Sequence, residues 1–316
     1  MSVSTVTHMI PGASGNRRIT LLMLTAFCLL VGVLWSVAPA SAQQLSGTLK
    51  KVRDSGTITI GYRENSLPFS YVVGNGQPIG YSIDLCLAIV DAVREEIEND
   101  SLKVAYIPVT SANRMDKLID GTIDLECGST TNNLERQKRV AFSPVFFVSG
   151  TKLLVKRSSG IKSYLDLRGK TVVVTAGTTN EKALRQISDR EKLGIVFVTA
   201  DDHAASFQKL DTGEAIAFAT DDVLLYGLIA QSKHGGDYAV VGDYISYDPY
   251  GLMLRKDDPE FAALILRTFQ TMASSRDLAQ LYDKWFKQRL RGGERLGLTM
   301  SAQLESIFGI LGQPEQ

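Results

Sequence analysis

Short apolar runs of strand length alternate with longer amphipathic runs along this chain, and the alternation occurs twice. Residues 57–62 alternate as a strand does, whereas residues 81–97 carry apolar side chains at helical spacing. The strand-like runs lie at residues 57–62, 104–107, 123–127, 171–175, 196–199 and 215–220. Because crossover helices join parallel strands, this order predicts two α/β lobes, each a mainly parallel sheet flanked by helices.

The end of the second round sends the chain back to the first lobe. The remaining elements are expected at residues 238–241, 250–254, 259–272 and 277–286. Polar turns follow the carboxyl ends of the strands in both lobes, which is where open α/β sheets bind ligands. We therefore expect a cleft between the lobes, with hinge strands near residues 147–153 and 241–247.

The first 42 residues have the pattern of a secretory signal peptide. Arg17 and Arg18 precede an apolar run at residues 19–37, and a small-x-small site predicts cleavage after Ala42. A retained membrane anchor is the alternative, because the apolar run is long enough to span a bilayer.

The expected mature chain divides into three parts. The predicted boundaries are residues 43–149 and 243–292 for lobe 1, 150–242 for lobe 2, and 293–316 for a tail of unassigned role. Removing 42 of 316 residues leaves 274, with 34 − 2 = 32 Lys and Arg against 34 Asp and Glu. This balance supplies no electrostatic reason to expect a nucleic acid partner.

Cysteines, histidines and catalytic motifs restrict the chemistry. Cys86 and Cys127 remain in the mature chain, where an oxidising compartment would allow them to pair, although two buried free thiols are the alternative. The sequence contains no GxxxxGK, HExxH or GxSxG motif, and its three histidines are too few for a histidine-rich metal centre. We expect no metal, no cofactor and no enzymatic activity.

A polar segment at residues 129–133 follows the strand-like run at 123–127 and Gly128, which is expected to let the backbone turn sharply. Asn132 and Glu135 fit a variant capping box, so we expect a helix to begin here and its unpaired N–H groups to favour an anion. A cation in a first turn is disfavoured by roughly 0.3–1 kcal/mol, so Arg136 is predicted to serve a bound anion. A solvated surface arginine is the alternative.

Several longer motifs together indicate a family. They are GYRENSLPFSY (61–71), PVTSANR (108–114), DLECGSTTNNLERQK (124–138), VVVTAGTTNE (172–181), Asp202-His203, AFATDD (217–222) and YGLMLRKDDP (250–259). Over about residues 47–290 the chain resembles the periplasmic glutamate/aspartate-binding proteins, which are the solute receptors of ABC importers. The resemblance implies a monomer of two lobes and two hinges that closes on L-glutamate or L-aspartate and delivers it to a membrane permease.

The resemblance also implies a ligand site. Its residues would be Arg63, Ser111, Arg114, Ser129, Thr131, Arg136, Thr179, His203 and Asp221. Arg136, with N–H groups around Thr131, would hold the α-carboxylate, and Asp221, with Ser129 and Thr131, would accept from the α-ammonium. Adjacent Asp222 is the alternative to Asp221.

The remaining residues of the implied site would hold the ligand side chain. Arg63, Arg114 and His203 resemble a side-chain carboxylate site, which His203 would strengthen only when protonated. Ser111 and Thr179 would be supporting donors. Arginine presents a planar fork to a carboxylate, so two arginines beyond the α-carboxylate clamp favour an acidic amino acid.

The function and the role of the tail stay open at this point. The functional alternatives are a dehydratase-like enzyme on the same fold and a receptor for another polar amino acid such as glutamine. The tail at residues 293–316 could pack on the first lobe, contact the permease or stay mobile.

Overall fold

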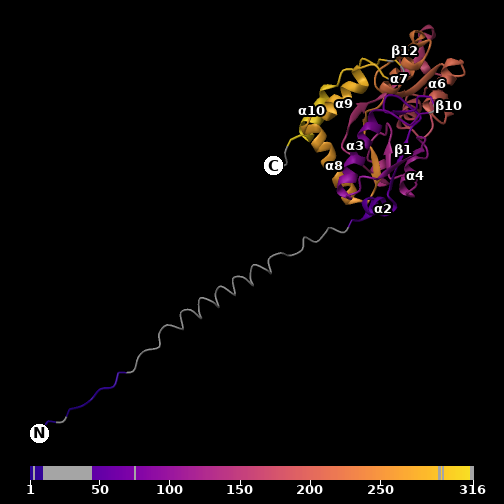
Figure 1. The fold of residues 1–316 in the computed structure, drawn as a ribbon. Helices are drawn as coiled ribbons and strands as arrows, with labels where there is room; N and C mark the ends of the chain where they lie inside the picture. Colours follow the sequence, from indigo (N-terminus) through magenta and orange to yellow (C-terminus); the bar gives the residue numbers. More distant parts are fainter. Residues whose placement is uncertain (3, 10–44, 75, 291–292, 294, 314–316) are drawn as a thin grey trace. The chain divides into compact units, whose positions relative to one another are not determined.

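A computed structural model describes residues 1–2, 4–9, 45–74, 76–290, 293 and 295–313 (Figure 1). The chain separates into two compact units, Met1–Leu45 and Ser46–Gln316, and the fold below is that of the second unit. The apolar run and cleavage site of the expected signal peptide lie outside the described residues. Within the described ranges no helix is both long and apolar enough to cross a membrane.

Two five-stranded sheets form the centre of the second unit. The first has the order β4-β1-β5-β14-β6 and the second the order β10-β9-β11-β8-β12. The first sheet comprises β1 Thr57–Tyr62, β4 Lys103–Pro108, β5 Leu125–Cys127, β6 Val140–Phe142 and β14 Met253–Arg255. The second comprises β8 Thr151–Lys156, β9 Thr171–Thr175, β10 Val196–Ala200, β11 Ala217–Asp221 and β12 Tyr238–Val241. The expected pair of α/β lobes is present.

Both sheets are more mixed than expected. In each sheet two pairings are parallel and two are antiparallel, the latter involving β6 and β14 or β8 and β12. The register explains this, because Thr151 at the start of β8 lies opposite Asp221 at the end of β11. A chain that crosses from the other lobe enters the sheet at its ligand-binding edge and must run away from it.

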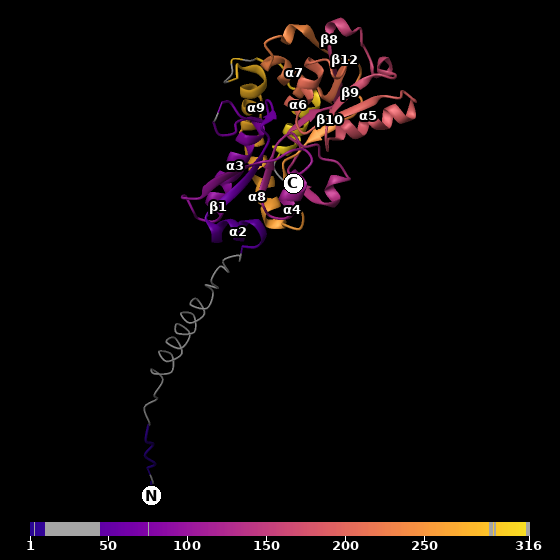
Figure 2. The same ribbon diagram turned by 90° about the vertical axis from the view of Figure 1, so that its right-hand side faces the viewer.

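Helices cover both sheets (Figures 1 and 2). Those of the first lobe are α2 Gly47–Ser55, α3 Tyr81–Glu96, α4 Arg114–Ile119, α8 Pro259–Ser274, α9 Asp277–Tyr282 and a π-helical turn Asp283–Lys287. Those of the second are α5 Thr179–Arg190, α6 His203–Asp211 and α7 Asp222–Gln231. Helix α8 packs against α2, α3 and α9, which returns the end of the chain to the first lobe as expected.

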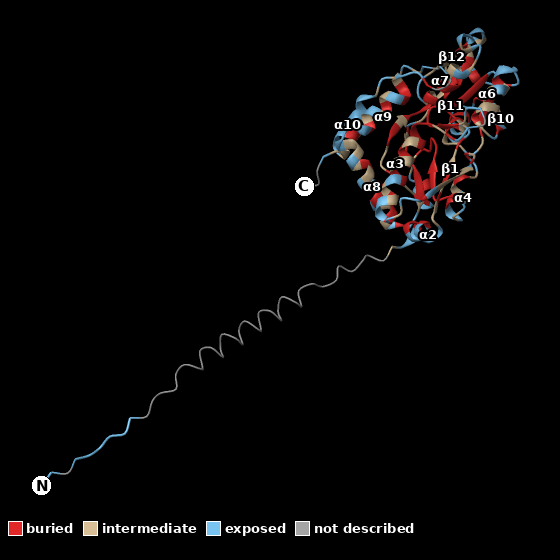
Figure 3. Ribbon diagram, viewed as in Figure 1, coloured by how far each residue is buried: buried red, intermediate tan, exposed pale blue. Residues whose placement is uncertain are grey.

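Short elements complete the described fold. A small hairpin is formed by β2 Asn65–Ser66 and β3 Ser70–Tyr71. The 3₁₀ turns are Arg136–Lys138, Arg157–Ser159, Tyr164–Leu167 and Gly235–Asp237. Figure 3 shows the buried residues concentrated on the sheets and the inner faces of the helices.

Two strands join the lobes. β7 Phe147–Ser149 pairs antiparallel with β13 Asp248–Tyr250, at or next to the expected hinge passages. Aromatic rings of the first lobe pack on this ladder, with the Phe147 ring stacked on Phe286 at a centroid distance of 4.9 Å. The Phe69 ring meets the Phe147 ring edge-on, also at 4.9 Å. These contacts fix the first-lobe side of both crossings.

The tail forms a helix, α10 Ala302–Leu311, that packs against α8 through buried Leu304 and Phe308 (Figure 1). The Gln303 Nε2 atom donates to the Tyr247 hydroxyl at 2.6 Å. Of the three alternatives for the tail, packing on the first lobe is the one that the described residues adopt.

Cys86 of α3 and Cys127 of β5 form a disulfide with a sequence separation of 41 residues. The bond ties the first long helix to the strand that leads into the polar segment at 129–133. Both cysteines are fully buried.

Replacing both cysteines (Cys86→Ala with Cys127→Ala) should lower the free energy of unfolding by about 3–4 kcal/mol, because the cross-link limits the unfolded chain. Alanine avoids burying an unpaired hydroxyl. Urea unfolding of the two proteins measures the difference. A reductant should bring the wild type to the level of the variant and leave the variant unchanged; equal stabilities without reductant would contradict the expectation.

Candidate functional site

A small cavity lies between the two lobes. It is lined by Arg63, Ser111, Arg114, Ser129, Thr131, Thr178, Thr179, Asn180, His203, Asp221 and Leu224. Its volume of about 10 Å³ is enough for about one water molecule. A ligand the size of an amino acid could enter only if the lobes part.

Polar contacts join the lobes around this cavity. Asn65 donates to the Asp202 carboxylate at 3.1 Å, and Lys182 forms an ion pair with Glu135. The structure therefore describes the closed arrangement of the lobes.

Two buried arginines form one wall. Arg63 and Arg114 are 2% and 3% exposed. Arg63 Nη1 donates to Ser111 Oγ at 2.8 Å, whereas Arg63 Nη2 and Arg114 Nε have no hydrogen-bond partner among the described residues. Burial, and next the charge of Arg114, lower the pKa of Arg63 to about 9. Such unpaired buried donors are costly, so this wall favours an anion.

Glu126 on β5 is the residue that sequence reasoning missed on this wall. It is fully buried, it lies 3.6 Å from the Arg114 guanidinium, and it accepts a hydrogen bond from Thr130 at 2.7 Å. A glutamate between apolar neighbours on a buried strand was the available signal, because a buried charge must be paired. A single carboxylate leaves the arginine pair with an excess of positive charge.

Gly128 lies at a bend, as expected. Its φ is not positive, and a Cβ at this position would lie 2.4 Å from Glu126 Oε1 and 2.9 Å from Arg63 Cγ. The glycine is therefore required because the backbone passes directly over the buried Glu126 and Arg63 side chains.

The expected helix after residues 129–133 is wrong. Only the three-residue 3₁₀ turn Arg136–Lys138 forms, because the preceding backbone pairs with the second crossing. Thr131 bridges Tyr250, and Asn132 N donates to Pro249 O at 2.7 Å. The capping box therefore does not form, and no helix dipole arises here. The groups that favour an anion are the buried arginines.

Arg136 is buried rather than solvated. Its Nη1 donates to Thr131 O at 2.9 Å, and its Nη2 lies 3.5 Å from Gly177 O of the second lobe. It does not line the cavity. Burial, followed by the charge of Arg114, lowers its pKa to about 10.

The opposite wall carries a carboxylate. Asp221 is 3% exposed and accepts from Asn180 Nδ2 at 2.8 Å and from the Tyr250 hydroxyl. Burial, and next the carboxylate of Asp248, raise its pKa well above the usual range. Asp222 does not line the cavity, since its carboxylate accepts from Ser149 Oγ and the Tyr244 hydroxyl, each at 2.6 Å.

His203 lies beside the arginines. Its Nδ1 is 2.9 Å from Thr175 Oγ1, and the ring is buried. Burial, followed by the charges of Arg63 and Arg114, lowers the pKa of His203 well below 6.5. The imidazole is therefore neutral in this arrangement at neutral pH, and its Nε2–H can donate when Nδ1 accepts from Thr175.

The cavity thus brings together eight of the nine expected residues, with Arg136 beside it. It adds Thr178, Asn180 and Leu224, and Asp248 holds two of the lining threonines. A two-lobed fold with two crossings and a polar site between the lobes is the type II periplasmic binding-protein fold.

Comparisons with known proteins agree with this class. The family described as bacterial extracellular solute-binding proteins, family 3, matches residues 58–288. The chain belongs to that family, and its function is solute binding.

Curated relatives are similar over most of the chain. An L-glutamate/L-aspartate-binding protein of Pseudomonas aeruginosa is 45% identical over 86% of this chain and 90% of the relative. A glutamate/aspartate import solute-binding protein of Salmonella typhimurium is 42% identical over 90% of this chain and 95% of the relative. The corresponding protein of Escherichia coli is 41% identical, over 86% and 90%. All three relatives are named as binding proteins, and two of the names describe import.

Solved structures share the fold. An ancestral arginine-binding protein bound to arginine aligns with a TM-score of 0.66 and 29% identity, covering 73% of this chain and 98% of that protein. An ancestral amino acid-binding protein that is a precursor of cyclohexadienyl dehydratase aligns with a TM-score of 0.65 and 30% identity, covering 76% and 100%.

Acidification should destabilise the closed arrangement of the protein through His203. Unfolding returns the pKa of this histidine to about 6.5. Below that pH the unfolded state therefore binds a proton that the folded state does not bind. Between pH 7.5 and 5.5 the wild type should therefore lose more free energy of unfolding than His203→Gln. Urea unfolding at both pH values measures this.

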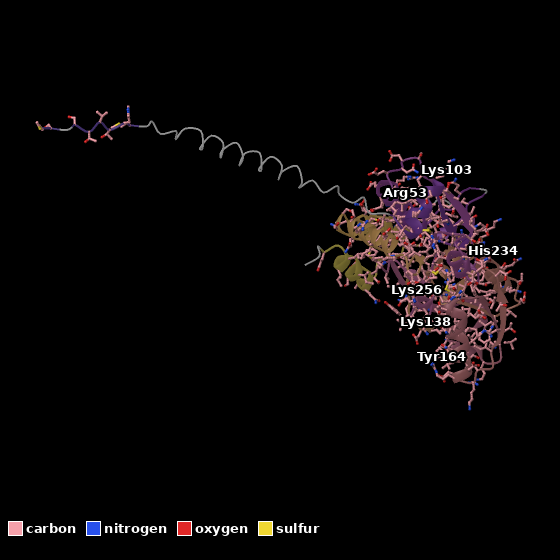
Figure 4. The ribbon with its side chains drawn as sticks, turned by 90° about the horizontal axis from the view of Figure 1, so that it is seen from below. Arg53, Lys103, Lys138, Tyr164, His234 and Lys256 are labelled. Atoms are coloured by element: carbon pink, nitrogen blue, oxygen red, sulfur yellow. A yellow bond between two sulfur atoms is a disulfide. The ribbon has the colours of Figure 1, made fainter. Side chains whose placement is uncertain are left out.

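His234 supplies the control for this measurement, because its side chain is exposed (labelled in Figure 4). His234→Gln should follow the wild type. A His203→Gln variant with the same pH dependence as the wild type would show that the buried imidazole takes up its proton normally.

Proposed function

We propose that this protein is a periplasmic receptor that captures L-glutamate or L-aspartate between its lobes and delivers it to an ABC-transporter permease. The observation that carries the proposal is the pair of buried guanidinium groups of Arg63 and Arg114. Each has a donor without a hydrogen-bond partner among the described residues, and Glu126 is the carboxylate that pairs with Arg114. The names of the curated relatives support the same ligands.

Charge matching favours a dicarboxylate. On the first-lobe side, Arg63, Arg114 and Arg136 carry three positive charges, whereas the buried carboxylates are those of Glu126 beside Arg114 and of Asp248, whose charge acts on Arg136. The two carboxylates of glutamate or aspartate would add the negative charge that these arginines still lack. Glutamine would supply only one, and a buried charge without a counter-charge is costly.

The ligand groups are assigned accordingly. We assign the side-chain carboxylate to Arg63, Arg114 and neutral His203, with Ser111 as a supporting donor. The α-carboxylate is assigned to N–H groups around Thr131, which Arg136 holds through the Thr131 carbonyl. Asp221, with Ser129 and Thr131, is assigned to the α-ammonium, and Thr179 supports the site from the second lobe.

The division into lobes is also a proposal. We keep residues 150–242 as the body of lobe 2, and 43–149 and 243–292 as lobe 1. However, Ile245 N donates to Thr151 O at 2.9 Å, and the Ile245 side chain packs on the core of the second sheet. The second boundary is therefore better placed near residue 247.

The cellular location and the oligomeric state of the protein are also proposals. We propose export through the signal peptide of residues 1–42 and function as a periplasmic monomer. The family description as extracellular and the relatives' names as import proteins support the export.

The side-chain assignment predicts a change in selectivity. Arg63→Ala should weaken glutamate binding by about 2–4 kcal/mol, about 30- to 1000-fold, while glutamine loses much less because its amide has no charge. Arg136→Ala is the control and should weaken both ligands alike. Calorimetric titration of refolded, ligand-free mature protein measures both affinities. An unchanged glutamate-to-glutamine ratio in Arg63→Ala would remove the basis for an acidic ligand.

The ammonium assignment distinguishes two adjacent acids. Asp221→Ala should cost about 2–5 kcal/mol of glutamate binding, because a buried cation loses its counter-charge. Asp222→Ala is the matched variant and should cost little, since the Asp222 carboxylate is engaged by Ser149 and Tyr244 away from the cavity. The same titration compares them, and a larger loss at Asp222 would assign the ammonium to the wrong residue.

A further inference from the structure

One buried carboxylate connects both lobes and the second crossing. Asp248 on β13 is 1% exposed. Its Oδ1 accepts from Thr131 Oγ1 of the first lobe and from Thr179 Oγ1 of the second, each at 2.9 Å. Its Oδ2 accepts from Ser246 of the second crossing. All three partners are hydroxyl groups.

The chemistry of this group suits it to hold two hydroxyls together. The Thr131 and Thr179 hydroxyl oxygens lie 3.1 Å apart, and each hydroxyl has one proton, which both donate to the shared Asp248 carboxylate. A carboxylate only accepts hydrogen bonds, and each of its oxygens can accept two. Among the described residues no ion pair engages Asp248, so these hydroxyls are the groups that stabilise its charge directly.

The position of Asp248 connects these contacts to the hinge. Its strand pairs with β7, where Asp248 lies opposite Ser149, and the following residues pair with the loop that carries Thr131. Asn132 N donates to Pro249 O, and Gly251 N donates to Thr130 O at 3.0 Å. Thr131 is therefore held to the crossing by backbone bonds, whereas Thr179 belongs to α5 of the other lobe. Parting of the lobes would break the Thr179 contact first.

We propose that Asp248 is a positioning residue that latches the lobes over the ligand: it binds Thr131 and Thr179 together only in the closed arrangement and so slows ligand release. The inference rests on the proposed function, since it requires an amino acid to be enclosed by lobe closure. Asp248 does not line the cavity, so the latch acts on closure and not on the choice of side chain.

The kinetic signature separates this role from a general loss of stability. Asp248→Ala should raise the dissociation rate of L-glutamate by about 10- to 100-fold and change the association rate by less than about threefold, because the contact forms after encounter. Its glutamate-to-glutamine affinity ratio should equal that of the wild type. Release of radiolabelled glutamate into excess unlabelled ligand, and rapid-mixing association, measure the two rates.

Asp258→Ala is the matched control. Asp258 is also a buried aspartate, 6% exposed, but it accepts from the Thr48 N–H and hydroxyl within the first lobe alone. It should release glutamate at the wild-type rate. If Asp258→Ala speeds release as much as Asp248→Ala, or if Asp248→Ala slows association alone, the latch is overturned.

A double-mutant cycle tests the partner. Thr179→Val removes the second-lobe donor at nearly constant volume, and the double variant with Asp248→Ala should release glutamate no faster than about threefold above Asp248→Ala alone. Multiplicative effects of the two substitutions would mean that they act independently, which contradicts a latch made by this contact.

The latch and the proposed ligand can fail separately. Small-angle scattering of wild-type protein with each of the twenty common amino acids identifies which of them compacts it. If only a non-acidic amino acid does, the proposed ligand fails, and the release rate of that amino acid from Asp248→Ala decides the latch. If none compacts the wild type, both proposals fail.

Discussion

Everything at this site depends on the antiparallel contact between the two crossing strands, β7 and β13. This short ladder is the place where the chain leaves the first sheet and returns to it, so it brings the polar edges of both sheets to face one another. Aromatic rings from the first lobe pack on Phe147 and secure one side of the ladder. The other side is bonded to residues 130–132, so the loop that lines the cavity is an extension of the hinge.

The charges are distributed to match this geometry. Buried arginines with one glutamate lie on the first-lobe wall, and Asp221 lies on the second-lobe wall. Burial makes an unpaired charge of either sign costly, which is why the pKa of Arg63 is lowered and that of Asp221 is raised. A zwitterion with an additional carboxylate relieves both walls, and the lobes have no comparable reason to enclose a neutral apolar molecule.

The site also shows which of its features sequence motifs can predict. Arg63, Arg114, His203 and Asp221 were implied by the family resemblance of motifs that follow predicted strands, and all four line the cavity. Local reasoning failed for residues 129–138, which have the composition of a helix start but form an extended segment and a 3₁₀ turn. The Asn132 N–H and the Thr130 carbonyl bond to residues 249 and 251, more than a hundred residues later, and no local pattern contains those competing partners.

The sequence by itself determined the order of the main strands and helices and the two lobes, because periodicity and strand-end turns are local properties. Only the tertiary structure decided which strands run antiparallel, that Glu126 neutralises part of the arginine charge, and that Asp248 joins Thr131 to Thr179. Those features depend on contacts between residues far apart in the chain. Their energies come from burial and hydrogen-bond geometry, which exist only once the chain has folded.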